Sequence, residues 1–130
     1  MSMKKDLRNP FKSTHVTLEG LFQMPILPNE EKALNALRAS LLKNYRLRDL
    51  RLFGSKAKGT DVQDSDLDVM IVLEDYSTVV ESEIDDLIFE INLEYDCFIT
   101  ALLFSQKELE WGPLSDSPIY KRIQEEGLRL

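Results

Sequence analysis

The apolar run at residues 69–74, VMIVLE, constrains the fold of this chain most strongly. It is nearly continuous in apolar residues and rich in β-branched ones, a pattern typical of a strand buried at the centre of a sheet. Residues 47–53 (LRDLRLF) alternate in polarity and stop at Gly54, which predicts a second strand. Residues 95–104 (YDCFITALLF) predict a third strand.

Helical patterns lie between and after these strands. From Asn29, a residue that can cap a helix, leucines recur on one face to about residue 45. A 3.6-residue period follows Thr78, which begins a capping-box spacing. Further helices are expected after Ser105 and between Ser117 and Gly127. This order predicts an α/β or α+β fold, with a small sheet covered by helices on one side.

The length and composition suit one globular domain. The chain has 130 residues, 43% of them hydrophobic and 30% charged. Residues 1–28 show little periodicity and carry three prolines, so we expect an N-terminal arm there and a domain at 29–130. The arm is expected to pack on the domain or on a partner, which makes a homo-oligomer or hetero-oligomer plausible.

Charge and cysteine content limit the function classes. The net charge of −7 disfavours strong direct binding to nucleic acid phosphates. One cysteine, Cys97, excludes an intrachain disulfide and favours a reducing, cytoplasmic location. No segment approaches 18 consecutive apolar residues, so we expect no membrane span.

The pair Gly54-Ser55 ends the first strand and predicts an anion site. Glycine allows a sharp turn and close approach of a ligand. If Ser55 opens a short helix, free backbone N–H groups and the hydroxyl would face a polyphosphate, and Lys56 and Lys58 add positive charge. Taken alone, a Gly-Ser pair more often indicates a simple strand-ending turn.

Two carboxylates open the central strand. Asp66 and Asp68 would share one face if the chain is extended there, with Leu67 turned into the core. Such a pair suits Mg²⁺, which takes oxygen ligands. Asp96 stands at the start of the next apolar run. Three converging carboxylates beside a phosphate site would form the arrangement of two-metal phosphoryl transfer, although an isolated Asp-x-Asp often lies in a solvated turn.

The spacing of these residues resembles a known signature. Gly54-Ser55, ten intervening residues and Asp66-x-Asp68 are similar to the GSX10DXD signature of the DNA polymerase β-like nucleotidyltransferase superfamily. The segments GSKAKG and DSDLDVMIV resemble those of its small branch, the minimal nucleotidyltransferases (MNT). This resemblance extends from about Leu34 to the C-terminus.

The resemblance implies a short mixed sheet flanked by helices, and roles for the site residues. It implies that Gly54 and Ser55 hold nucleotide phosphates, with Lys56 and Lys58 at positions that are commonly basic. It implies metal and catalytic roles for Asp66, Asp68 and Asp96.

The resemblance also implies an activity and a partner. The expected reaction is Mg²⁺-dependent transfer of AMP from ATP to a hydroxyl. MNT proteins are often antitoxins paired with a HEPN ribonuclease toxin, and some modify a tyrosine of that toxin. Two alternatives stay open: a non-catalytic antitoxin that neutralises its partner by binding, and a nucleotidyltransferase acting on an RNA end or a small molecule.

Overall fold

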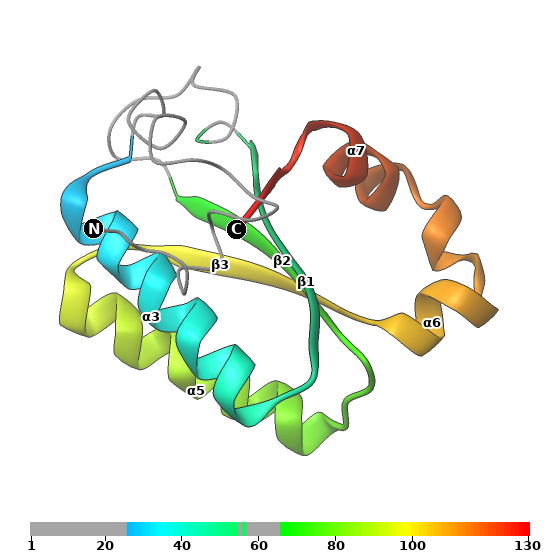
Figure 1. Ribbon diagram of the computed structural model, residues 1–130, viewed down its shortest axis with the longest axis horizontal. Coiled ribbons are helices and arrows are strands. Elements are labelled where there is room, and N and C mark those ends of the chain that lie inside the picture. Colours follow the sequence, from blue (N-terminus) through cyan, green and yellow to red (C-terminus); the bar gives the residue numbers. More distant parts are fainter. Residues whose placement is uncertain (1–25, 55, 57–65) are drawn as a thin grey trace, which may run out of the picture.

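The computed structural model describes residues 26–54, 56 and 66–130. Their helices and strands follow one another along the chain as α3 (Pro28–Asn44), β1 (Leu47–Phe53), β2 (Leu67–Leu73), α5 (Thr78–Tyr95), β3 (Ile99–Ser105), α6 (Gln106–Trp111), the 3-10 helix η1 (Pro113–Asp116), α7 (Pro118–Glu126) and β4 (Leu128–Arg129). This order confirms a mixed α+β fold (Figure 1).

The four strands form one mixed sheet in the order β3-β2-β1-β4. β2 runs parallel to β3 and antiparallel to β1, and β1 pairs antiparallel with the short β4. Residues Val69 to Leu73 of β2 are at most 2% exposed. The prediction of a buried central strand is therefore confirmed. β4 was not predicted, because two residues after a helix-ending glycine carry no recognisable period.

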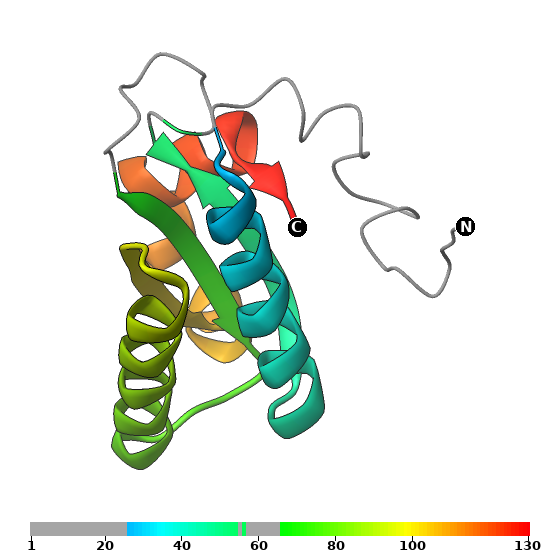
Figure 2. The same cartoon turned by 90° about the vertical axis from the view of Figure 1, so that its left-hand side faces the viewer.

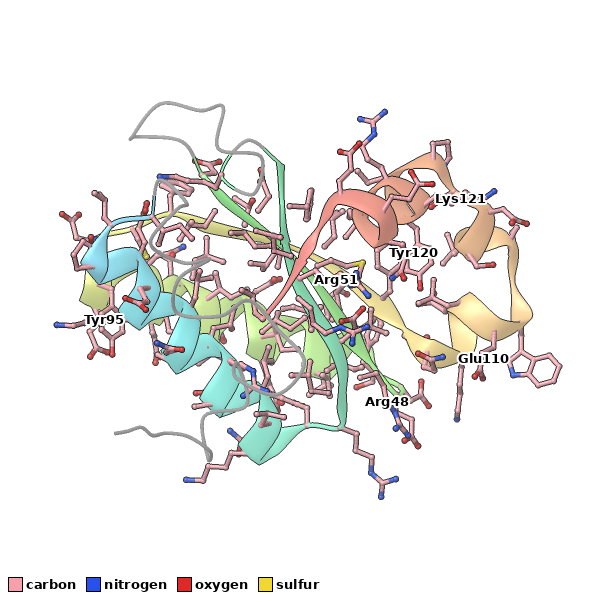
Figure 3. The ribbon with its side chains drawn as sticks, turned by 45° about the horizontal axis from the view of Figure 1, so that its top comes forward. Arg48, Arg51, Tyr95, Glu110, Tyr120 and Lys121 are labelled. Carbon is pink, nitrogen blue, oxygen red and sulfur yellow. The ribbon has the colours of Figure 1, made fainter. Side chains whose placement is uncertain are left out.

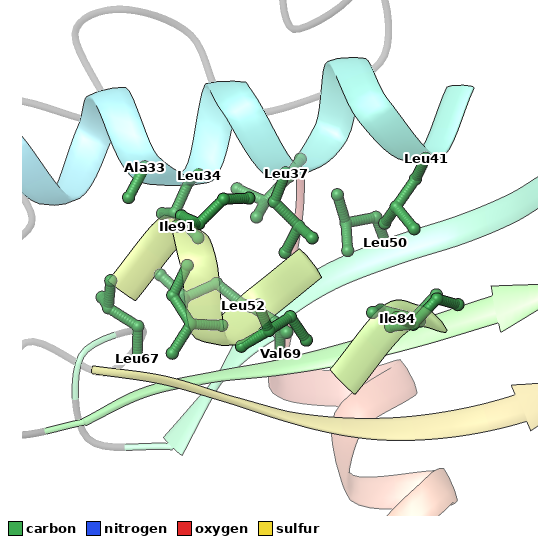
Figure 4. Close-up of a cluster of buried hydrophobic side chains, with 14 of the residues drawn as sticks. Ala33, Leu34, Leu37, Leu41, Leu50, Leu52, Leu67, Val69, Ile84 and Ile91 are labelled. Atoms are coloured by element: carbon green, nitrogen blue, oxygen red, sulfur yellow. The ribbon is translucent and has the colours of Figure 1, made fainter. Parts of the chain in front are cut away.

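The helices α3 and α5 lie side by side on one face of the sheet (Figure 2). Alternate residues of β1 and β2 point into this layer, where they meet the leucines of α3 and the isoleucines of α5 (Figure 4). The residues of β2 in this cluster are Leu67, Val69, Ile71 and Leu73. We call this side the closed face, because it holds the main hydrophobic core.

Short helices cover part of the opposite side, which we call the open face. Here Met70 and Val72 of β2 pack with Phe104, Leu109 and Ile123. Tyr120 of α7 meets the Phe104 ring edge-on, with centroids 5.7 Å apart. Arg51 of β1 lies beneath α7 and donates hydrogen bonds to the Asp49 carboxylate and the Gln124 carbonyl (Figure 3). The expectation of helices on one side only is therefore wrong.

The start of α3 differs from the prediction. The helix begins at Pro28 with Leu27 as its N-cap, and the Glu30 carboxylate accepts a hydrogen bond from the Leu27 N–H at 2.9 Å. Asn29 lies inside the helix. Its side-chain amide donates to the carbonyl oxygens of Tyr95 and Asp96, which joins the start of α3 to the end of α5. Residues 1–25 lie outside the described residues, so the arm and the boundary near residue 28 stay a prediction.

The third strand begins later than predicted. α5 continues to Tyr95, and Asp96 is its C-cap with a left-handed backbone (φ 53°). The carboxamide of Asn92 both accepts from the Ile99 N–H and donates to the Ile99 carbonyl. These two hydrogen bonds fix the turn between helix and strand, so that β3 starts at Ile99. Sequence periodicity missed this turn because residues 95–98 are nearly as apolar as the strand.

Candidate active site

Gly54 and Asp68 are in direct contact where β1 ends and β2 begins. Phe53, the last residue of β1, is paired with Asp68 in the antiparallel ladder. Gly54 has φ +77°, and a Cβ built on it would lie 2.5 Å from Oδ2 of Asp68. Only glycine combines this backbone conformation with this approach. The predicted association of the glycine turn with the Asp-x-Asp pair is therefore present for these two residues.

The two aspartates lie on the open side of the sheet. Leu67 between them is fully buried in the closed-face core, and its N–H continues the ladder to β3 by donating to the Phe98 carbonyl. Side chains alternate along an extended chain, so Asp66 and Asp68 both point away from that core. Asp68 is partly buried, whereas Asp66 is exposed.

Thr100 is a site residue that the sequence did not reveal. The parallel register of β2 and β3 sets it beside Asp68, and its hydroxyl donates a hydrogen bond of 2.8 Å to Oδ1 of Asp68. This bond fixes the carboxylate while Oδ2 faces Gly54. No spacing rule points to Thr100, because the partner of Asp68 on β3 depends on where β3 starts.

Asp96 does not occupy the predicted position. It caps α5 three residues before β3, its side chain is exposed, and its carbonyl rather than its carboxylate contacts Asn29. Among the described residues, no three acidic, histidine or cysteine side chains are grouped to hold a metal ion. The expected convergence of Asp66, Asp68 and Asp96 is therefore wrong, and the β3 residue beside Asp68 is a threonine.

Lys56, which was predicted to add positive charge to the phosphate site, is buried. Its side chain is 0% exposed, and its ammonium lies 3.2 Å from Oε1 of Glu30, whose side chain is 7% exposed. The same Glu30 oxygen accepts the hydrogen bond from the Leu27 N–H. A buried ion pair of this kind is strongly destabilising to break on one side only, because the other charge stays buried. We correct the prediction for Lys56: the positive charge that the sequence assigned to the phosphate site is paired with Glu30 of α3.

The remaining predicted phosphate ligands, Ser55 and Lys58, lie outside the described residues, and their roles stay predictions. The described residues do fit a divalent cation. Asp66 and Asp68 offer hard carboxylate oxygens, and Mg²⁺ is commonly bound by one or two carboxylates with water and substrate phosphates. The missing Cβ at Gly54 keeps free the space in which Oδ2 of Asp68 lies.

A mixed sheet with a glycine turn packed against an Asp-x-Asp strand defines the class of the protein. Residues 34–128 match the model of the nucleotidyltransferase domain family, and the chain belongs to this family. It is a nucleotidyltransferase.

Two known proteins are similar to this chain. A protein of Methanocaldococcus jannaschii described as a "putative protein adenylyltransferase" is 31% identical over 106 residues, which cover 76% of this chain and 95% of that protein. A crystal structure of a "putative nucleotidyltransferase" from Sulfolobus solfataricus aligns over 72% of this chain and 77% of its own, with a TM-score of 0.44 and 14% sequence identity.

Within the described residues, none of the helices is both long and apolar enough to cross a membrane.

Proposed function

We propose that the protein is a Mg²⁺-dependent adenylyltransferase that moves AMP from ATP to a hydroxyl group of a partner protein. The observation that carries the proposal is the contact between Gly54 and the Asp68 carboxylate. It supports a site in which the turn at Gly54 binds phosphates and Asp68 binds the metal ion. The name of the Methanocaldococcus jannaschii relative supports a protein as the acceptor.

In this proposal, different residues of the site bind the phosphates and the metal ion. The turn that begins at Gly54 binds the phosphates of ATP, with Ser55 and Lys58 as predicted donors. Asp66 and Asp68 hold Mg²⁺, and Thr100 keeps the Asp68 carboxylate in place through its hydrogen bond. Bound Mg²⁺ would neutralise charge on the triphosphate.

The reaction itself is a displacement at the α-phosphorus. The acceptor oxygen forms a bond to this phosphorus while the bond to pyrophosphate breaks, and the hydroxyl proton passes to water. Positioning and charge stabilisation contribute most to such a reaction.

We propose a HEPN ribonuclease toxin as the partner and one of its tyrosines as the acceptor, so that the protein acts as an antitoxin. The surface of α5 supports a basic partner. This helix carries six acidic residues and no basic one, and Phe89 and Leu93 on its surface are 64% and 68% exposed. An apolar patch bordered by one sign of charge is suited to a partner of the opposite charge.

One observation favours a second candidate, an antitoxin that acts by binding alone. The described residues lack the third carboxylate that two-metal transfer would use. A protein of this kind would bind its partner without modifying it. We expect transfer nevertheless, because Gly54, Asp68 and Thr100 keep a contact geometry that binding alone does not require.

The test is transfer of label from ATP labelled at the α-phosphate to a co-purified HEPN partner. The wild-type protein should label the partner, and the double variant Asp66→Asn/Asp68→Asn should not. Both proteins should unfold at similar temperatures without ligand, and Mg-ATP should raise the Tm of the wild type alone. Equal labelling by the double variant would overturn the metal assignment. Tight partner binding with neither labelling nor a Tm shift would establish the binding protein.

A further inference from the structure

Asp68 has no acidic neighbour on either adjacent strand. Its partner in the antiparallel ladder is Phe53 of β1, and its partner in the parallel ladder is Thr100 of β3. The sequence of β3, ITALLFS, contains no acidic residue, so no position along this strand supplies a carboxylate to the site. An aromatic side chain and a hydroxyl therefore flank Asp68, where a two-metal site would need a further acid.

The acidic residue that comes just before β3 is held away from this position. Asp96 ends α5 with a left-handed backbone, and its side chain is exposed. The two hydrogen bonds between the Asn92 carboxamide and Ile99 fix the turn that follows. Asp96 therefore stays outside the strand and does not take the place of Thr100.

The two oxygens of the Asp68 carboxylate have different surroundings. Oδ1 accepts the 2.8 Å hydrogen bond from the Thr100 hydroxyl, whereas Oδ2 faces Gly54. A carboxylate that bridges two cations uses one oxygen for each of them. The Thr100 hydroxyl thus occupies the β3 side of Asp68, where a second cation would have to lie.

The charge of the described residues at the site also suits a single cation. In two-metal sites the ions lie about 3.5–4 Å apart, so anionic ligands have to offset their mutual repulsion. Asp66 and Asp68 each contribute one negative charge, and Thr100 contributes none. A single Mg²⁺ shared between one or two carboxylates and substrate phosphates matches this set of ligands.

We propose that the site holds one divalent cation, bound by Asp66, Asp68 and the nucleotide phosphates, and that Thr100 is the residue that keeps a second cation out. This inference rests on the proposed function and deepens it, because the three carboxylates expected from the sequence would have held two ions. The acceptor hydroxyl then has no cation of its own at this site, so contacts with the partner protein have to orient it.

The experiment counts the Mn²⁺ ions bound to the full chain by electron paramagnetic resonance. Mn²⁺ prefers the same oxygen ligands as Mg²⁺. It is titrated into protein held in excess over α,β-methylene ATP, an analogue that cannot release pyrophosphate. Two Mn²⁺ ions about 4 Å apart couple magnetically and give a spectrum that differs from that of an isolated ion. We expect the wild type to bind one ion per complex, without the coupled spectrum.

Thr100→Asp should convert the site to two ions. It places a third carboxylate beside Asp68, so we expect a second bound Mn²⁺ and the coupled spectrum. Its Tm without ligand should lie below that of the wild type, because three carboxylates then repel one another. Mn²⁺ and the analogue should raise the Tm of this variant more than that of the wild type, since ions that bind only the folded state stabilise it.

Thr100→Asn is the matched control, because asparagine has the shape of aspartate without its charge. It should bind one ion, as the wild type does. Two ions in Thr100→Asn, or a single ion in folded Thr100→Asp, would overturn the assignment of Thr100. If Thr100→Asp does not fold, the count in the wild type still decides how many ions the site holds.

The wild-type result separates this inference from the proposed function. Two coupled ions in the wild type would overturn the single-cation site and leave the proposed function intact. If the wild type with the analogue binds no more Mn²⁺ than Asp66→Asn/Asp68→Asn does, the metal assignment and with it the proposed function fail.

Discussion

The two faces of the sheet differ in how completely they are covered. Fifteen buried residues form the cluster on the closed face, against five on the open face. Long helices cover the first, whereas α6, η1 and α7 are short and cover only part of the second. The closed face therefore contributes most of the stability of the sheet, whereas the partly covered open face leaves the ends of β2 and β3 accessible for chemistry.

The strand β2 contributes side chains to both faces of the sheet. Along β2, Leu67, Val69 and Ile71 enter the closed-face core, while Asp68 and Met70 point the other way. A slip of one residue in the register would exchange these sets, so burial of the apolar set also aims the carboxylate. Burial of the apolar side chains on the closed face therefore fixes the orientation of Asp68 on the open face.

The largest effect on stability is expected at the buried ion pair between Lys56 and Glu30. Lys56→Met leaves the Glu30 carboxylate buried without its ammonium, and we expect the free energy of unfolding to fall by about 3–5 kcal/mol. Urea denaturation measures it. The double variant Glu30→Met/Lys56→Met should recover most of the loss, since no charge is then left buried.

The control for this pair is Lys107→Met. Lys107 and Asp75 form an ion pair in which both side chains are more than 60% exposed. We expect a change within about 0.5 kcal/mol. If Lys56→Met and Lys107→Met were equally tolerated, the buried position of Lys56 would be wrong.

The second prediction compares leucine deletions on the two faces. Leu52→Ala empties a fully buried site on the closed face and should cost about 3–5 kcal/mol, because the close-packed core cannot collapse around the cavity. Leu109→Ala, on the open face at 7% exposure, should cost about 2 kcal/mol. Thermal and urea unfolding measure both. Equal losses would remove the distinction between the faces.

The third prediction concerns Gly54. Gly54→Ala forces a Cβ toward Oδ2 of Asp68 and strains a positive φ, so stability should fall by about 1–3 kcal/mol. Nucleotide transfer should fall much further than the folded fraction does, since the carboxylate itself is displaced. Parallel loss of activity and of folded protein would show that Gly54 is needed for folding alone.

The smallest effect is expected at Thr100. Thr100→Val keeps the shape of the side chain but removes the donor to Oδ1 of Asp68, which should cost about 0.5–1.5 kcal/mol. Thr100→Ser keeps the hydroxyl and should retain more transfer activity than Thr100→Val, as measured with labelled ATP. Higher activity in the valine variant would contradict a positioning role for the hydroxyl.

Sequence alone predicted the elements whose signals are local. The strand β1 was predicted at its observed bounds, and β2 within two residues of them. The last helix begins after Ser117, whose hydroxyl accepts from the Tyr120 N–H as its cap, and its C-cap is Gly127. Alternation, apolar runs and caps involve residues only a few positions apart, so they can be recognised without the fold.

The residues whose positions the sequence predicted wrongly, Asp96 and Lys56, are positioned by segments far away in the chain. Asp96 was predicted to stand at the start of a strand over residues 95–104, and only the hydrogen bonds of Asn92 to Ile99 show where that strand starts. Lys56 was predicted to add positive charge to the phosphate site, because its partner Glu30 is 26 residues away on another element.

Local patterns were enough to predict that a glycine turn and two carboxylates stand at the ends of neighbouring strands, because such patterns set the strands and their faces. The contact of Asp68 with Thr100 in place of Asp96, and the burial of Lys56, became evident only in the folded protein. Strand register and the burial of a charge depend on packing between segments far apart in the chain, and no local pattern encodes that packing.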